Sequence, residues 1–271
     1  MVENGVLDLD SIEEIVFPGG ELHFALDKKD IVETFVVSAK LRNASDIIKL
    51  ILVTNILNQF KGKGQLSLYM PYSPYARQDR VANSGEPLSI KAFAQIINSL
   101  GYQTVHIIDP HSDVTIALIE NALSSLNIET LLKKVVPEYE TMTVIAPDAG
   151  AYKKLSKIIK STPIVQCTKH RDTLTGKLSN LMIHTEEDLS GKDLIVVDDI
   201  CDGGGTFIRL AEELKKKYQP KSLSLYVTHG IFSKGLDVLK PYYDKIYTTD
   251  SFYQGETDDF VVVEKLMENA Q

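Results

Sequence analysis

The chain has 271 residues, of which 44% are hydrophobic and 24% charged, an ordinary globular composition with enough length for one large or two modest domains. A formal net charge of −8 argues against a general nucleic-acid-binding protein, because such proteins are usually basic. Two cysteines are too few for a disulfide framework. No apolar run approaches the roughly 20 residues of a membrane span. The first residues, MVENGVLDLD, do not resemble a signal peptide. We therefore expect a cytoplasmic protein with buried thiols.

Short apolar runs alternate with helix-patterned segments along most of the chain. Helical patterns start at Asp46 (DIIKLILVTNILNQF) and at Pro87 (PLSIKAFAQIINSLG), where Ser89 is the predicted N-cap and Gly101 the predicted C-terminal stop. Strand–helix alternation predicts an α/β fold with two doubly wound parallel-sheet domains. The predicted strands are Thr34–Ser38, Ser67–Met70, Val105–Asp109, Thr143–Ala146, Leu194–Val197, Ser222–Thr228 and Lys245–Thr248.

The least patterned connection is VVPEYETM, residues 135–142, and it divides the chain into predicted domains 1–137 and 138–271. In doubly wound folds, ligands bind beyond the carboxyl ends of the parallel strands. The polar residues at those predicted ends are Arg77, Gln78, Asp79, Asp109, His111, Asp148, Asp198, Asp199, Asp202 and His229.

The stretch LIVVDDICDGGGTF, residues 194–207, has an apolar run, three acids and three glycines before a helical pattern. Backbone N–H groups of residues 203–206, with the Thr206 hydroxyl, can surround a phosphate at the helix start. Asp198 and Asp199 can accept hydrogen bonds from two ribose hydroxyls. A ribose phosphate satisfies both groups; the alternative is an acidic loop that only caps a helix. The predicted ribose-phosphate-binding residues are Asp198, Asp199, Asp202, Gly203, Gly204, Gly205 and Thr206.

VVDDICDGGGT resembles the phosphoribosyl-pyrophosphate loop of phosphoribosyltransferases and ribose-phosphate pyrophosphokinases. The other motifs are similar to the pyrophosphokinases and occur in that family's order: YARQDR (75–80), DPH (109–111), APDAG (146–150), KHR (169–171) and THGIFS (228–233). Ordinary phosphoribosyltransferases lack YARQDR. The resemblance implies transfer of the β,γ-diphosphoryl group of ATP to the C1 hydroxyl of ribose 5-phosphate, which gives phosphoribosyl pyrophosphate (PRPP) and AMP.

The resemblance also implies an ATP site. An arginine suits phosphate binding and purine stacking, and a glutamine with an aspartate can read an adenine edge. For Arg77 and Asp79 the alternative is a helix cap or salt bridge, and for His111 a packed histidine at a strand end. The implied ATP-binding residues are Phe17, Glu21, Arg77, Gln78, Asp79 and His111.

Magnesium is the cofactor that the family resemblance implies, with His111 and Asp148 at the metal positions. Mg²⁺ prefers oxygen ligands, so substrate phosphates must complete so sparse a shell. The stretch TKHRDTLTGKLS, residues 168–179, reads as a mobile basic lid, and the resemblance gives Lys169 and Arg171 catalytic roles. His170 stands where the family has an arginine. The alternative for this stretch is a solvated charged turn.

Three departures from the family pattern affect these expectations. FPGGE, residues 17–21, has Gly19 where the family has an acid, which leaves nucleotide preference open. The loop reads DGGGT instead of DTAGT, so it lacks a threonine donor beside the 5-phosphate and has room for an esterified phosphate, as in ADP-ribose. The chain is also shorter than typical relatives, and its helix after DPH reads VTIALIENAL. In the family, the element at the position of FPGGE reaches the adenine of a neighbouring subunit, so the resemblance implies a homo-oligomer with an ATP site shared between subunits. The shorter chain lacks surfaces that relatives use for hexamer packing, so a hexamer is not necessarily expected.

Four functions are compatible with these patterns. PRPP synthesis from ATP and ribose 5-phosphate leads, and the same chemistry on a 5-esterified ribose phosphate such as ADP-ribose, giving ADP-ribose pyrophosphate, is the alternative. YARQDR and KHR argue against a phosphoribosyltransferase. A non-catalytic regulatory subunit would tend to lack the lid and metal residues, which are present. Neither nucleic acid nor membrane is an expected partner.

Overall fold

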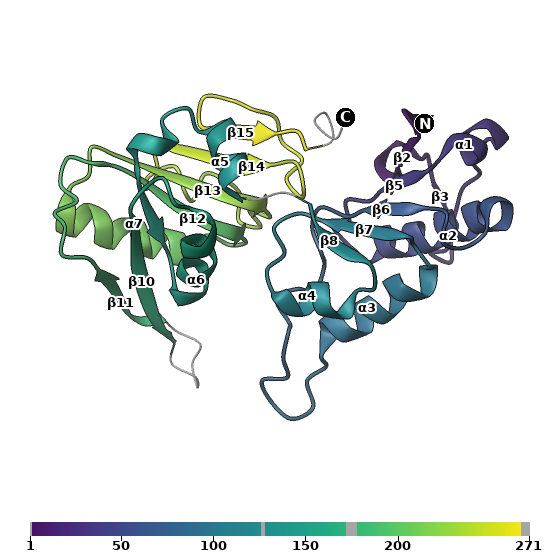
Figure 1. Cartoon of the computed structure of the whole chain (residues 1–271), viewed down its shortest axis with the longest axis horizontal. Helices are drawn as coiled ribbons and strands as arrows, with labels where there is room; N and C mark the ends of the chain where they lie inside the picture. The colour runs from purple at the N-terminus through teal and green to yellow at the C-terminus, as the bar shows by residue number, and fades with distance from the viewer. Residues whose placement is uncertain (1, 126–127, 172–177, 267–271) are drawn as a thin grey trace. The chain divides into compact units, whose positions relative to one another are not determined.

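The computed structural model of the chain describes residues 2–125, 128–171 and 178–266, with the backbone alone described at 169–171 and 178–181 (Figure 1). The chain forms two compact units, Met1–Leu126 and Asn127–Gln271. Each unit has its own cluster of buried apolar side chains. The α/β class with two parallel-sheet domains is therefore confirmed.

The boundary between the units precedes helix α5 (Ile128–Val135), whereas the sequence pattern put it after Pro137. The apolar side of α5 is buried and contacts strand β15 (Val261–Glu264) and the 3-10 helix η2 (Tyr139–Thr141). Lys134 of α5 also forms an ion pair with Glu264. Because these contacts belong to the second unit, α5 does too.

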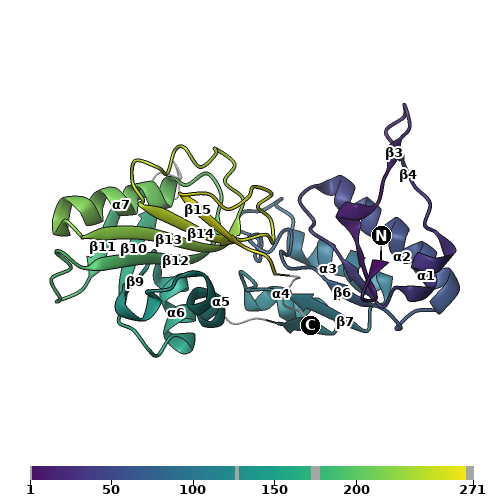
Figure 2. The same cartoon turned by 90° about the horizontal axis from the view of Figure 1, so that it is seen from above.

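Unit 1 has a six-stranded sheet in the order β1-β2-β5-β6-β7-β8. Its strands are parallel except for β1, which pairs with β2 in the antiparallel direction. The strands are β1 (Val2–Glu3), β2 (Val6–Asp8), β5 (Val36–Ser38), β6 (Ser67–Tyr69), β7 (Thr104–Ile107) and β8 (Ala122–Ser124). The helices are η1 (Leu9–Ser11), α1 (Lys28–Glu33), α2 (Ala44–Lys61), α3 (Ser89–Leu100) and α4 (Asp113–Leu118). A separate hairpin, β3 (Ile15–Val16) with β4 (Leu22–His23), extends from this unit (Figure 2).

Helix α3 shows how the local sequence produces the elements of unit 1. Its buried residues Ile90, Phe93 and Ile97 recur at helical spacing and join the core. Gly101 ends the helix with φ of 72°, in the left-handed region that favours glycine, as predicted. The N-cap prediction was wrong: Leu88 precedes the helix and no side chain caps it.

Unit 2 has a seven-stranded sheet in the order β11-β10-β9-β12-β13-β14-β15. Only β11 is antiparallel to its neighbour. The further strands are β9 (Thr143–Ala146), β10 (Ile164–Arg171), β11 (Leu178–His184), β12 (Asp193–Cys201), β13 (Ser222–Gly230) and β14 (Lys245–Thr249); the helices are α6 (Ala149–Ile158) and α7 (Gly205–Tyr218). The chain reverses its direction across the sheet between β9 and β12, and ligands bind at such a switch point in doubly wound folds.

Among the described helices, none combines the length and the apolar character needed to span a bilayer. Both cysteines are free and buried, as expected, and burial raises the pKa of the Cys167 and Cys201 thiols to about 12.

Candidate active site

Two loops at the carboxyl ends of β6 and β7 meet in unit 1. Asp79, in the loop after β6, accepts hydrogen bonds from Arg80 Nε at 2.8 Å and from Ser112 Oγ at 2.8 Å. The hydrogen bond from Arg80, followed by that from Ser112, lowers the pKa of Asp79 below its ordinary value. Since Ser112 directly follows the DPH motif, this carboxylate joins the YARQDR and DPH loops. Ser112 was not anticipated as part of the site, although its position after DPH was a usable signal.

The backbone of both loops is strained where they leave the sheet. Tyr75 has φ of 62° and Asp109 φ of 43°, which are uncommon for residues with a side chain. Such strain occurs often at binding sites. The side chains of Arg77, Gln78 and His111 are exposed at this same edge of the sheet.

Phe17 and Glu21 lie apart from these loops, on the β3–β4 hairpin of unit 1. Phe17 N–H donates to the Glu21 carbonyl at 2.9 Å, and the Phe17 ring stacks on His23 with centroids 5.7 Å apart. Phe17 is nevertheless 46% exposed, and its neighbours Ile15 and Val16 are still more exposed.

Two ion pairs fix the segment that leads into this hairpin. Arg42 contacts both carboxylate oxygens of Asp10, at 3.0 and 2.8 Å. The buried Lys49 lies 2.9 Å from Glu14 and donates to the Ile12 carbonyl. The hairpin therefore leaves the unit from an anchored base.

Three carboxylates gather at the switch point of unit 2. Asp148 follows β9, and Asp198 and Asp199 lie on β12. Burial, and then the charges of Asp199 and Asp148, raise the pKa of Asp198 well above its ordinary value. Such a site favours a proton, a cation or hydroxyl donors near Asp198.

The strand that the sequence predicted over Leu194–Val197 does not end before the acids Asp198 and Asp199. β12 continues through them, with Asp198 opposite Val227 and Cys201 opposite Gly230 of β13. Pairing with the long buried strand β13 keeps the chain extended after its apolar run has ended. Both acids are thus held on sheet backbone, which positions them more rigidly than a loop would.

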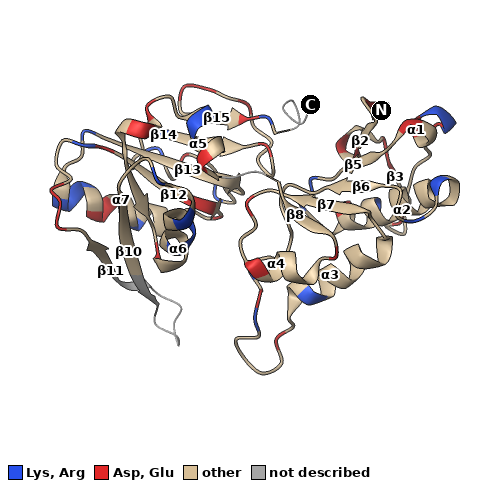
Figure 3. Cartoon of the chain, viewed as in Figure 1, with Lys and Arg blue, Asp and Glu red and all other residues tan. Residues whose placement is uncertain are grey.

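The glycine triplet lies between β12 and helix α7, and Gly204 is the N-cap of that helix. Its φ of 76° is in the left-handed region, and an added Cβ would lie 3.0 Å from Leu239 Cδ2. No side chain caps α7 and no acid lies in its first turn, whereas its last turn carries Lys215–Lys217 (Figure 3). The N–H groups of the first turn of a helix without a side-chain cap suit an anionic group such as a phosphate.

The segment after β13, residues 231–235, is hydrogen-bonded to the glycine loop. Ile231 and Phe232 N–H donate to the Cys201 carbonyl at 2.9 and 3.1 Å. Ser233 N–H donates to the Asp202 carbonyl at 3.2 Å, and Ser233 Oγ donates to Asp202 Oδ1 at 2.6 Å. Asp202 thus has a structural partner, which the sequence did not predict, although THGIFS was identified as a motif. His229, at the end of β13, is buried with Nδ1 2.8 Å from Ser251 Oγ.

Lys169 and Arg171 lie on strand β10, but their side chains and residues 172–177 lie outside the described part of the chain. The predicted irregular lid is in part a hairpin, because β10 pairs with β11 from Gln166 to Arg171, with a register shift between His170 and Arg171. Apolar periodicity did not reveal these strands, since residues 168–179 are mostly polar.

The residues predicted to hold magnesium form only part of a site. Within the described ranges, no group of three or more His, Cys, Asp or Glu residues has the geometry of a metal site. Mg²⁺ binds through one or two carboxylates with waters and substrate phosphates, so a complete protein cage is not required. Asp148 fits this pattern as a single carboxylate at the end of β9, where its Oδ1 caps α6 by accepting from Ala151 N–H at 2.9 Å.

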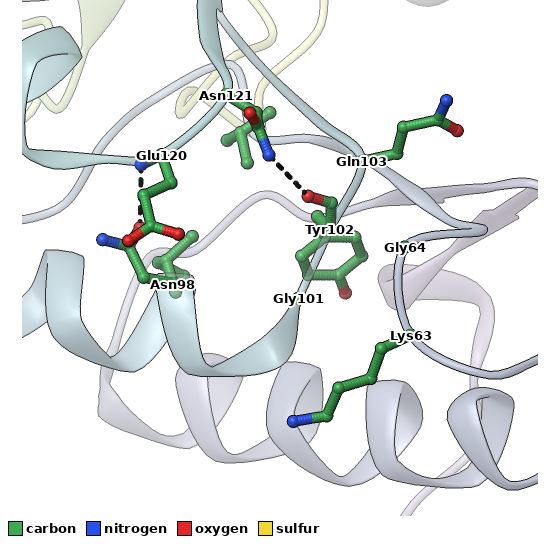
Figure 4. Close-up of a pocket in the computed structure, with 10 residues that line it drawn as sticks. Lys63, Gly64, Asn98, Gly101, Tyr102, Gln103, Glu120 and Asn121 are labelled. Carbon is green, nitrogen blue, oxygen red and sulfur yellow. Dashed lines mark hydrogen bonds between the residues drawn. The ribbon is translucent and has the colours of Figure 1, made fainter.

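A pocket of about 380 Å³ lies at the amino ends of β7 and β8, opposite the carboxyl ends that carry the YARQDR and DPH loops (Figure 4). Gln103 and Asn121 line it just before β7 and β8 begin. Its amides mainly hold backbone: Asn98 Oδ1 accepts from Glu120 N–H at 2.9 Å, and Asn121 Nδ2 donates to the Tyr102 carbonyl at 3.2 Å. None of the predicted site residues lines this pocket.

Comparison with known proteins relates both units to one family. A family model described as the phosphoribosyl transferase domain matches residues 117–266, more than half of the chain. A ribose-phosphate pyrophosphokinase of Thermococcus kodakarensis is 30% identical over 81% of this chain and 77% of its own length. One of Mycoplasmopsis pulmonis is 27% identical over 90% of this chain and 78% of its own length.

The fold agrees with these sequence matches. The crystal structure of phosphoribosylpyrophosphate synthetase from Mycobacterium smegmatis superposes with a TM-score of 0.75 at 20% identity, over 93% of this chain and 86% of that one. With the YARQDR and DPH loops joined in unit 1 and the acidic strand and glycine loop in unit 2, the chain belongs to the ribose-phosphate pyrophosphokinase family of transferase enzymes.

Proposed function

We propose that this protein transfers the β,γ-diphosphoryl group of ATP to the C1 hydroxyl of ribose 5-phosphate, which yields PRPP and AMP. The observation that carries the proposal is the acidic end of β12 next to the uncapped start of α7, at the switch point of unit 2. Carboxylates there suit ribose hydroxyls, and backbone N–H groups suit a phosphate. Family membership supports the same reaction.

The reaction joins the C1 oxygen to the β-phosphorus as the bond from the β-phosphorus to the oxygen bridging to the α-phosphate breaks. AMP leaves with that oxygen, and the hydroxyl proton passes to solvent. Asp198 and Asp199 would orient the ribose, and the N–H groups of Gly205 and Thr206 would hold its 5-phosphate. Bound Mg²⁺, with Asp148 as one ligand, would neutralise phosphate charge.

On the nucleotide side, Arg77 would bind ATP phosphates or stack on the purine, while Gln78 and Asp79 would contact the adenine edge. His111 would contact ATP and its metal. Lys169 and Arg171 would stabilise the charge that develops around the β-phosphorus during transfer, since such chemistry depends mainly on positioning and positive charge.

The first test is AMP release from Mg·ATP by the purified protein, with ribose 5-phosphate and ADP-ribose as parallel acceptors. Strong release with ribose 5-phosphate supports the proposal. Lys169→Ala should then reduce the rate on the order of 10²–10³-fold, the usual loss for one such donor. The matched control is Lys157→Ala, which deletes an exposed charge in the last turn of α6 and should retain full activity. No release with either acceptor would contradict the proposal.

A 5-esterified ribose phosphate is a second candidate acceptor, favoured by the space around the loop. At Gly203, where the family's loop has threonine, the three atoms nearest to an added Cβ belong to the flexible stem of Lys234, at 3.4–3.7 Å, which is ordinary van der Waals contact. AMP release chiefly with ADP-ribose would support this candidate. Gly203→Thr, which restores the residue of the family's loop, would then fill the space and reduce ADP-ribose-dependent release more than any ribose 5-phosphate-dependent release. An equal loss with both acceptors would count against it.

We further propose a homo-oligomer in which the β3–β4 hairpin completes the ATP site of a neighbouring copy. The exposed Phe17, Ile15 and Val16 on an anchored hairpin support this arrangement. Two variants, Phe17→Ala and Arg77→Ala, test it. Each should be weak alone, whereas a mixture reassembled from both should regain activity, because some sites would then combine two unchanged halves. A fully active monomer in light scattering would contradict the shared site.

A further inference from the structure

The side chain of Lys234 lies across the glycine loop. A Cβ placed on Gly203 would lie 3.4 Å from Cε, 3.6 Å from Cδ and 3.7 Å from Cγ of Lys234. The aliphatic stem therefore lies within van der Waals contact of the position that a Cβ at residue 203 would take. Its ammonium is one bond beyond Cε, and so lies at the loop as well.

The backbone around Lys234 is held in place independently of this contact. Ser233 makes two hydrogen bonds to Asp202, and Gly235 N–H donates to the Phe232 carbonyl at 2.8 Å. Phe232 and Gly235 both have positive φ, of 46° and 75°, so a tight turn presents the lysine. A side chain on a preorganised turn binds a ligand at a smaller entropic cost.

The charges nearby explain why a cation is needed at this position. The end of β12 and the glycine loop carry Asp198, Asp199 and Asp202, whose field opposes binding of a phosphate dianion. Across the part of the chain that the structure describes, Lys234 has no ion-pair or hydrogen-bond partner, and it is exposed. A lysine that lies against the glycine loop without an ion-pair partner among the described residues is placed for an anionic ligand.

We propose that Lys234 determines specificity for the phosphate of the sugar substrate: its ammonium donates charge-assisted hydrogen bonds to the phosphate oxygens bound at the start of α7. Gly203 is its counterpart, because a side chain longer than that of alanine at residue 203 would compete with the Lys234 stem for the space over the loop. The inference rests on the proposed function, since it takes a ribose phosphate as the ligand of this loop.

Calorimetric titration of the full chain with ribose 5-phosphate tests the role of Lys234 without turnover. Lys234→Met keeps most of the stem and removes the charge, and it should raise Kd about 10- to 100-fold, the loss expected for one charge-assisted bond. Lys234→Arg should restore binding to within a few-fold. Lys216→Met, which removes the same charge from the far end of α7, is the control and should leave Kd unchanged.

Turnover adds a second readout that a merely structural lysine would not produce. If the wild type is active, Lys234→Met should raise KM for ribose 5-phosphate in parallel with Kd and leave kcat nearly unchanged, because the phosphate is bound equally before and during transfer. An unchanged Kd in Lys234→Met, with active protein, overturns the inference alone. A Kd that depends on Lys234 in a protein that releases no AMP overturns only the proposed reaction. Failure of the wild type to bind ribose 5-phosphate overturns both.

Discussion

Gly204 and Gly205 are adjacent in the same triplet but differ in what their backbone requires. Gly204 has φ of 76° and faces Leu239 at 3.0 Å from an added Cβ, so both conformation and space require glycine. Gly205 is the first residue of α7, has no positive φ and faces open space. Only the first of these glycines is therefore needed for folding, and the second is free to serve a ligand.

Gly204→Ala should lower the free energy of unfolding by about 1–2 kcal/mol or more, from left-handed strain together with the Leu239 contact. Gly205→Ala should leave it unchanged or raise it by up to about 1 kcal/mol, because alanine restricts the unfolded chain. Urea unfolding of both variants measures the difference. Equal effects at the two positions would contradict the distinct roles of the two glycines.

Asp198 makes the stability of the free protein depend on pH. Burial and its acidic neighbours raise its pKa above the value of 3.8 that it has when exposed. The folded state therefore holds this proton more tightly than the unfolded state does. Asp198 therefore contributes to the free energy of unfolding at low pH, and this contribution is lost as the pH rises from about 4 through the pKa of Asp198 in the folded protein.

The free energy of unfolding of Asp198→Asn, relative to wild type, should therefore increase as pH rises from 5 to 8. Urea unfolding of both proteins at several pH values measures this trend. Asp193→Asn is the control. Hydrogen bonds from Ser222 and then Lys221 lower the pKa of Asp193, so its titration lies below this range and its effect should be independent of pH here. A flat difference for Asp198→Asn would show that its carboxylate is adequately solvated.

At the scale of elements, α2 starts with a reciprocal cap. Asn43 Oδ1 accepts from Asp46 N–H at 3.1 Å, and Asp46 Oδ2 accepts from Asn43 N–H at 3.1 Å. The same carboxylate oxygen accepts from Arg42 N–H at 2.7 Å. This capping box orients the chain that leads from β5 to the helix and keeps Arg42 near Asp10 at the base of the hairpin.

Asn43→Ala should lower the free energy of unfolding by about 1 kcal/mol, because it leaves an N–H group at the helix start without its acceptor. Asn55→Ala is the matched control: the same change in the exposed interior of α2 should be neutral or slightly stabilising, since alanine is the better helix former. Thermal unfolding of the two variants distinguishes these outcomes. Equal losses would mean that the cap adds nothing to the stability of unit 1.

At the scale of the whole molecule, two units with separate cores carry the two groups of proposed site residues. The loops with Arg77 and His111 belong to unit 1, and the acids with the glycine loop belong to unit 2. Each of these two half-sites lies at the carboxyl ends of the strands of its own unit. Ligand binding should therefore be detectable in each unit separately.

Hydrogen exchange measured by mass spectrometry should show this division. Ribose 5-phosphate should slow exchange in residues 198–207, and AMP should slow exchange in residues 75–80 and 109–112, because bound ligands suppress local opening. Residues 97–103, at the opposite edge of the unit 1 sheet, provide an internal control that neither ligand should protect. Protection by ribose 5-phosphate confined to unit 1 would contradict the assignment of the half-sites.

The sequence by itself determined the α/β class, the helix after the glycine triplet and the motifs that carry the family resemblance, because alternating periodicity and local motifs are properties of short segments. Gly101 is an example, since its left-handed stop depends only on its own backbone. Tertiary structure decided what depends on distant pairing: β12 extends through Asp198 because β13 lies beside it, and α5 joins unit 2 because its apolar side meets β15. It also decided that Lys234 lies over Gly203 and that Ser233 contacts Asp202. The residues of each pair are 31 positions apart in the chain. No local pattern specifies such a contact, because it arises only after both strands have entered the same sheet.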